Sequence, residues 1–146
     1  MKKQITTIVA TVTLIATLTI AGIAGLGNTV SANIPFEFTV NGKTLPAGNY
    51  LVTRGSAPGA LTIRNAKKGM AAVAIVQGAE NGKSGKASLS FRRYGNQYFW
   101  AGVSDGNSVS ELPISKAERR AARGKDHLAV NETKAEIVII NATAGQ

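Results

Sequence analysis

Few residues in this sequence carry the side chains that most enzymes use for catalysis. The chain has no cysteine, and its one histidine, His127, lies in a polar stretch beside Asp126. The lack of cysteine removes disulfides, thiolate metal sites and cysteine nucleophiles. One histidine cannot complete a multi-histidine zinc site, and a lone histidine in a polar stretch is typical of a solvated side chain. The sequence therefore predicts no metal site and no cofactor.

The carboxylates are the remaining candidates for acid–base chemistry, because a pair of them can hydrolyse a glycosidic bond. Their spacing favours no particular pair. The sequence also lacks a G-x-S-x-G elbow, a phosphate loop and a dinucleotide fingerprint. We therefore expect no enzyme and name no catalytic residue, and a hydrolase is kept as the third hypothesis. The carboxylates after the amino-terminal segment are Glu37, Glu80, Asp105, Glu111, Glu118, Asp126, Glu132 and Glu136.

The amino-terminus has the layout of an export signal. Residues 1–3 carry two lysines, and a long uncharged run rich in Ile, Val, Leu, Thr and Ala follows. The small residues Val30 and Ala32 suit a signal peptidase, so residues 1–32 are predicted to be a signal peptide and the mature chain to begin at Asn33. An uncleaved membrane anchor is the alternative, because the run approaches the roughly 20 residues that span a bilayer.

Residues 33–146 are expected to form one exported domain, periplasmic or extracellular, with a single core. The whole chain has a formal net charge of +9, and removal of Lys2 and Lys3 leaves +7 on this part. A basic exported domain favours anionic partners such as lipid headgroups or acidic polysaccharide. No motif indicates specific nucleic-acid binding, contact with a membrane is expected only through an uncleaved signal segment, and the oligomeric state stays open.

The segment IPFEFTVNGKTLPAGNYLV, residues 34–52, predicts a hairpin. Phe38 and Val40 alternate with polar residues, which is typical of a strand with one apolar face. Both residues of Asn41-Gly42 tolerate the positive φ of a type I′ turn. A two-residue turn there would set Phe38 opposite Leu45, on the same apolar face.

A second turn is predicted at Pro46-Ala47-Gly48. Proline fixes φ at the first corner, and Gly48 supplies the positive φ expected at the third residue. Tyr50 and Val52 then resume the alternation of a third strand.

The rest of the chain continues the strand pattern, with one helix near 115–123. Ser115 and Glu118 form a capping box that begins this helix, and Gly124 follows it. Residues 70–76 are apolar on both faces and predict a central strand, whereas residues 79–86 predict a polar loop. The fold class is therefore mainly β, an antiparallel β-sandwich or small barrel of about 7–8 strands with one short helix. Further strands are predicted at Ala60–Arg64, Met70–Gln77, Ala87–Tyr94, Gln97–Val103 and Ala135–Asn141.

Three segments together resemble a group of small exported bacterial proteins of unassigned function. These proteins share an IPF-x-F opening with a GKTLPAG-x-Y turn, an RYG-x-x-YF hairpin and an ELP-x-S-x-AER helix, and the match spans residues 34–123. The resemblance implies export and a β-rich domain, and it implies no chemistry. Separately, residues 45–50 are similar to the L-P-x-G-x-Y turn in the B-type repeats of bacterial collagen adhesins, which are stalk-like β-sandwiches.

The hairpin FRRYGNQYFW contains the first candidate surface. Gly95-Asn96 predicts a type II′ turn, which sets Arg92 opposite Phe99. Arg92, Tyr94 and Phe99 then share the face opposite the core, where they could bind a sugar ring or a base. Alternatively, they stabilise the sheet as ordinary cation–π pairs.

The helix carries the second candidate surface. Lys116, Arg119, Arg120 and Arg123 recur at helical spacing and form a basic stripe that could contact an anionic surface. The alternative is a solvated helix face. A large apolar face, which an interfacial membrane helix needs, is missing.

These features predict an exported, non-enzymatic envelope or extracellular interaction module. The alternative from another class is a small-ligand or carbohydrate-binding β-domain that uses Arg92, Tyr94 and Phe99. A concave aromatic face would favour the binding domain, a cleft with converging carboxylates would favour the hydrolase, and flat polar surfaces would favour the interaction module.

Overall fold

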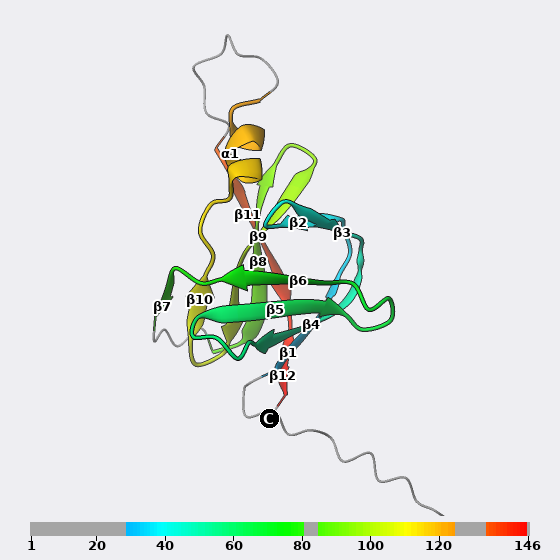
Figure 1. Ribbon diagram of the computed structural model, residues 1–146, viewed down its shortest axis with the longest axis vertical. Helices are drawn as coiled ribbons and strands as arrows, with labels where there is room; N and C mark the ends of the chain where they lie inside the picture. Colours follow the sequence, from blue (N-terminus) through cyan, green and yellow to red (C-terminus); the bar gives the residue numbers. More distant parts are fainter. Residues whose placement is uncertain (1–28, 81–84, 125–133, 146) are drawn as a thin grey trace, which may run out of the picture.

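The computed structural model describes residues 29–80, 85–124 and 134–145. The expected export signal lies mostly outside these residues, as do His127, Asp126 and Glu132. Within them the chain forms twelve strands in two sheets and one helix (Figure 1). The predicted fold class, mainly β with a sandwich-like arrangement, is confirmed, and the sheets do not close into a barrel.

The five-stranded sheet has the order β12-β1-β4-β5-β6, and every neighbouring pair in it is antiparallel. Short runs of alternating burial along β1, β4 and β5 place one apolar face of this sheet toward the core. Its strands are β1 (Thr29–Ile34), β4 (Gly48–Arg54), β5 (Ala60–Asn65), β6 (Ala71–Ile75) and β12 (Thr143–Gly145).

The seven-stranded sheet has the main order β11-β8-β9-β10-β7, and the small hairpin β2–β3 joins it through one parallel bridge between Thr39 and Phe99. The helix α1 (Lys116–Ala122) follows β10 and lies at one end of the molecule (Figure 1). The strands are β2 (Phe38–Val40), β3 (Lys43–Leu45), β7 (Gly78–Glu80), β8 (Ala87–Tyr94), β9 (Gln97–Asp105), β10 (Val109–Glu111) and β11 (Glu136–Asn141).

Both predicted hairpins have the expected register. Phe38 pairs with Leu45 across the Asn41-Gly42 turn, where φ is 49° and 81°, as a type I′ turn requires. Arg92 pairs with Phe99 across Gly95-Asn96, and Gly95 has a φ of 60°. Two-residue turns thus fix which side chains face the core before any distant contact forms.

The core lies between the two sheets and is built around aromatic side chains. The ring of Phe38 packs edge-to-face on Tyr50 and on Phe91, with centroids 5.0 and 5.3 Å apart. The Tyr50 hydroxyl donates to the carbonyl oxygen of Pro46 at 2.6 Å, so the second predicted turn is tied to the core by this tyrosine. Leu89 and Trp100 are also buried in this core.

The prediction that residues 70–76 form a central strand is wrong. β6 lies at an edge of the five-stranded sheet, and Val73 and Ile75 are more than half exposed. Apolar residues on both faces led to the error, because a strand of this composition is typical of a sheet interior. The two backbone carbonyls of Ala71 and Val73 instead accept hydrogen bonds from side chains of the β2–β3 hairpin.

The predicted signal cleavage site falls inside β1. Val30 and Ala32 are buried, and residues 29–31 are the pairing partners of β12. Cleavage after Ala32 stays a prediction, and it would remove the ladder that β12 makes with β1. The short strands β7, β10 and β12 have too few residues for a recognisable alternation, and the sequence did not predict them.

Candidate functional site

The basic helix α1 begins at a hydrogen-bonded cap. The Ser115 Oγ accepts from the backbone N–H of Glu118 at 3.1 Å, which is half of the predicted capping box. The other half is wrong, since the Glu118 side chain turns to the sheet. Arg123 is the C-cap rather than a helical residue, and Gly124 follows with a φ of 68°.

Glu118 fastens the helix to the seven-stranded sheet. Its carboxylate pairs with the guanidinium of Arg92, through Nε to Oε1 and through Nη2 to Oε2 at 3.2 Å. The Tyr94 hydroxyl donates to Oε1 at 3.2 Å, and Arg92 Nη2 also donates to the Leu112 carbonyl at 3.1 Å. Side-chain exposure is 2% for Glu118 and 16% for Arg92, so this ion pair is largely desolvated.

The predicted ligand-binding face lies against this helix. Phe99 is only 5% exposed, and its ring packs on Tyr94 with centroids 5.9 Å apart. Arg92 and Tyr94 both use their polar atoms on Glu118. The structure therefore brings the three residues together, but as a packed junction between sheet and helix rather than an open aromatic surface.

The four cationic side chains of the stripe point away from that junction. Lys116, Arg119, Arg120 and Arg123 are all exposed, whereas Glu118 on the opposite side of the helix is buried. Arg119 also donates to the Ile114 carbonyl at 3.4 Å. The stripe is thus a cationic surface on a helix that Glu118 holds against β8 through Arg92 and Tyr94.

Two of the described carboxylates, Asp105 and Glu136, have structural partners. Among the described residues, no group of three or more His, Cys, Asp or Glu side chains could hold a metal ion. Asp105 holds the β9–β10 turn by accepting from the backbone N–H groups of Asn107 and Ser108, at 2.9 and 2.7 Å. Glu136 forms an exposed ion pair with Arg93 at 3.3 Å.

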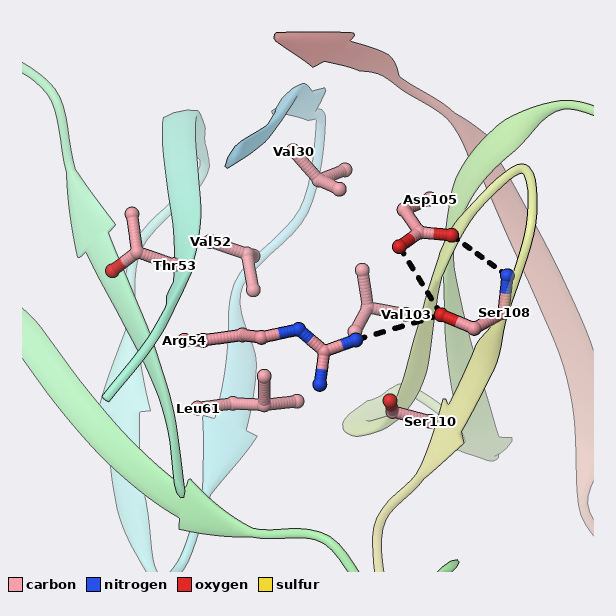
Figure 2. A pocket seen from close by; sticks show the side chains of 9 residues that line it. All are labelled: Val30, Val52, Thr53, Arg54, Leu61, Val103, Asp105, Ser108 and Ser110. Atoms are coloured by element: carbon pink, nitrogen blue, oxygen red, sulfur yellow. Dashed lines mark hydrogen bonds between the residues drawn. The ribbon is translucent and has the colours of Figure 1, made fainter. Parts of the chain in front are cut away.

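A small cavity opens between the two sheets near Arg54 (Figure 2). Apolar side chains such as Val52 and Leu61 line one side, and the Asp105–Ser108 turn lies across from them. Arg54 reaches across the gap, with its Nη2 3.5 Å from Ser108 Oγ. The volume of about 20 Å³ suits one water molecule and is too small for a sugar or a nucleotide.

A larger groove, of about 380 Å³, runs between the β2–β3 hairpin and the β8–β9 turn. Four aromatic residues line it: Phe38 and Phe99 are buried, and the rings of Phe36 and Tyr98 stack on each other with centroids 3.9 Å apart. The Arg93 guanidinium lies 5.5 Å from the centre of the Tyr98 ring. Tyr98 is therefore already engaged by two side chains, which leaves it poorly placed to stack on a sugar.

Comparison of the chain with models of protein families, with characterised proteins and with solved structures gave no match. In the parts of the chain that the structure describes, no helix has the length and apolar character needed to cross a membrane.

Sequence reasoning did not find the Arg92–Glu118 pair, because 26 residues separate the two in the chain. It also did not single out Ile137 and Ile139, which are 58% and 56% exposed on β11. The signal for the latter was present in the run EIVIIN, since isoleucines alternating on an outer strand must face either a second layer or solvent.

Proposed function

We propose that the protein is an exported, non-enzymatic interaction module that uses helix α1 to contact anionic groups of the cell envelope or its surroundings. The observation that carries this proposal is the exposed row of Lys116, Arg119, Arg120 and Arg123 on a helix whose opposite side is anchored by a desolvated ion pair. Export itself is proposed from the layout of residues 1–32.

The anchor supports a binding role because it limits the cost of association. A helix of seven residues is marginal in isolation. Held by Glu118 and capped by Ser115, its backbone keeps the four cationic residues on one exposed face. Less conformational entropy is then lost when an anionic surface binds. Net charge adds to this, since residues 33–146 carry a formal net charge of +7, which is attracted to anionic surfaces.

Binding to anionic vesicles and to an acidic polysaccharide tests the proposal. Replacement of Arg119, Arg120 and Arg123 with glutamine should weaken binding severalfold, and added salt should weaken wild-type binding, because the screening length shrinks to about 8 Å at physiological ionic strength. A preference for vesicles or for the polysaccharide tells which source of anionic groups the helix favours.

The matched control replaces Arg64, Lys67 and Lys68 with glutamine. These three side chains are also exposed, and they lie at the β5–β6 turn of the other sheet. Both triple variants lose the same charge. Equal loss of binding in the two variants would mean that net charge, and not the helix, does the binding.

A small-ligand or carbohydrate-binding domain is the second candidate. Its best support is the groove between the β2–β3 hairpin and the β8–β9 turn, where Thr39, Asn96 and Gln97 supply polar atoms. The engaged Tyr98 ring and the buried Phe99 make this candidate weaker than the helix surface. No catalytic residue is proposed.

A further inference from the structure

Among the described residues, β11 is an edge strand that contains no lysine, no proline and no bulge. It pairs with β8 on one side and ends the seven-stranded sheet. From Ile137 to Asn141 it contains no charge and no proline. The flanking charge of Glu136 is compensated by Arg93 of β8. Natural proteins usually protect such an edge with lysine, proline, a bulge or a covering segment.

The opposite arrangement is seen at the other apolar edge, β6. There the Asn41 amide donates to the Val73 carbonyl and the Lys43 ammonium to the Ala71 carbonyl, each at 2.8 Å. These side chains occupy backbone acceptors that an incoming strand would need. The two edges have equally exposed apolar residues, so the difference between them lies in the backbone.

The hydrogen-bond pattern tells which backbone groups of β11 face outward. The N–H of Ala142 donates to the Ala87 carbonyl, and the register sets Asn141 opposite Ser88. Since bonded positions alternate along an antiparallel pair, the even-numbered residues of β11 bond to β8. The N–H and C=O groups of Ile137 and Ile139 therefore point away from the sheet.

The side chains of β11 are apolar on both faces. Ile137 and Ile139 lie on the outer face opposite Arg92 and Ser90, and both are more than half exposed. Val138 and Ile140 lie on the core face and are only partly buried. An added strand would therefore have to be apolar on both of its faces, and β11 itself satisfies that condition.

We propose that β11 pairs with β11 of a second copy of this chain, antiparallel, about a two-fold axis at Val138. Ile137 of each copy then lies opposite Ile139 of the other, so that the four exposed isoleucines form one apolar cluster. The outward N–H groups of these four residues donate to the outward carbonyls of the residues opposite them. Val138 lies opposite Val138 on the core face. An axis at Ile139 would instead set Ile137 against Asn141, which leaves the isoleucine block broken.

Sedimentation velocity of the purified exported protein tests the association. Wild-type protein should be a dimer, and Ile137→Lys with Ile139→Lys should be a monomer, because the lysines put like charges across the new pairing. The matched control is Val73→Lys with Ile75→Lys on β6, where the native side chains are 53% and 56% exposed. This variant should remain a dimer. A monomeric wild type, or a dimer that tolerates the β11 lysines, overturns the proposal.

Single cysteines test the register, since the chain has none of its own. Opposed residues at a non-hydrogen-bonded position have Cα atoms about 4.5 Å apart, within the range of about 4.4–6.8 Å that a disulfide needs. Val138→Cys should therefore give a disulfide-linked dimer on mild oxidation, and Ile139→Cys should not. Cross-linking of Ile139→Cys in preference to Val138→Cys overturns the two-fold axis at Val138.

Salt separates this inference from the proposed function. Two copies that each carry a net positive charge repel, so added salt should strengthen the dimer. The same salt should weaken contact between α1 and an anionic surface. Loss of dimer with rising salt contradicts the strand pairing, whatever the helix binds.

Discussion

At the scale of single residues, Gly48 shows how one backbone position limits the sequence. Its φ is 155°, and a Cβ added there would lie 2.9 Å from Nδ2 of the buried Asn65. Asn65 cannot easily yield, because its Oδ1 accepts from the N–H groups of Lys67 and Lys68 at 3.0 and 2.9 Å. Backbone and neighbour both restrict this position to glycine.

Gly48→Val should lower the free energy of unfolding by about 1–3 kcal/mol, because the branched side chain meets both strain and a close contact. Urea denaturation measures the change. The control is Gly78→Val, where an added Cβ meets no atom within 4 Å, and it should shift the midpoint little. Equal midpoints for wild type and Gly48→Val would show that the Pro46–Gly48 turn does not need glycine.

Burial of the Arg92–Glu118 ion pair determines how much its loss should destabilise the protein. Glu118→Gln should destabilise the junction by about 1–3 kcal/mol, because it leaves the Arg92 guanidinium without its anionic partner in a desolvated site. Hydrogen exchange of the amides in α1 should rise. Glu136→Gln, at the exposed pair with Arg93, should change stability by less than about 1 kcal/mol. Similar effects of the two substitutions would contradict the burial argument.

At the scale of elements, the helix α1 depends on its cap as much as on its anchor. Ser115→Ala removes the acceptor for the Glu118 N–H and should cost about 1 kcal/mol. Far-ultraviolet circular dichroism is insensitive to so short a helix, so hydrogen exchange of residues 116–122 is the better measurement. Ser115→Asp should restore protection, and a failure to do so would mean that the cap is not what begins the helix.

The two hairpins could be predicted from sequence because their information is local. Asn41-Gly42 and Gly95-Asn96 fix turn type, and turn type fixes register. The edge position of β6 could not be predicted, because the groups that bind its outer carbonyls, Asn41 and Lys43, lie 32 and 28 residues away in the sequence. The burial of Phe99 was missed for the same reason, since a strand pattern does not show which helix will lie on it.

The predicted signal-peptide cleavage site lies within β1. The mature chain should begin at Asn33, which amino-terminal sequencing of the exported protein checks directly. A chain that begins at Thr29 should be more stable to urea than one that begins at Asn33, by about 2 kcal/mol. The reason is that Val30 is buried and that, among the described strands, β12 pairs with residues 29–31 of β1. Recovery of protein that still carries Met1 in membranes would show an anchor in place of a cleaved signal.

At the scale of the whole molecule, two exposed surfaces lie on elements of the seven-stranded sheet and its helix. We propose that the cationic side of α1 contacts anionic groups and that the uncharged edge β11 pairs with a second copy of the chain. The sequence indicated the first, because four basic residues recur at helical spacing. The second needed the topology, which shows that β11 ends its sheet.

The central claim is that α1 is where the protein meets its anionic partner. The most direct test is a titration of isotopically labelled protein with a soluble acidic oligosaccharide, followed by the amide chemical shifts of every assigned residue. The largest shifts should fall on residues 116–123 and should vanish in the glutamine variant of Arg119, Arg120 and Arg123. Shifts centred on the groove at Tyr98, or on the turn at Lys67 and Lys68, would contradict the assignment of the helix as the contact surface.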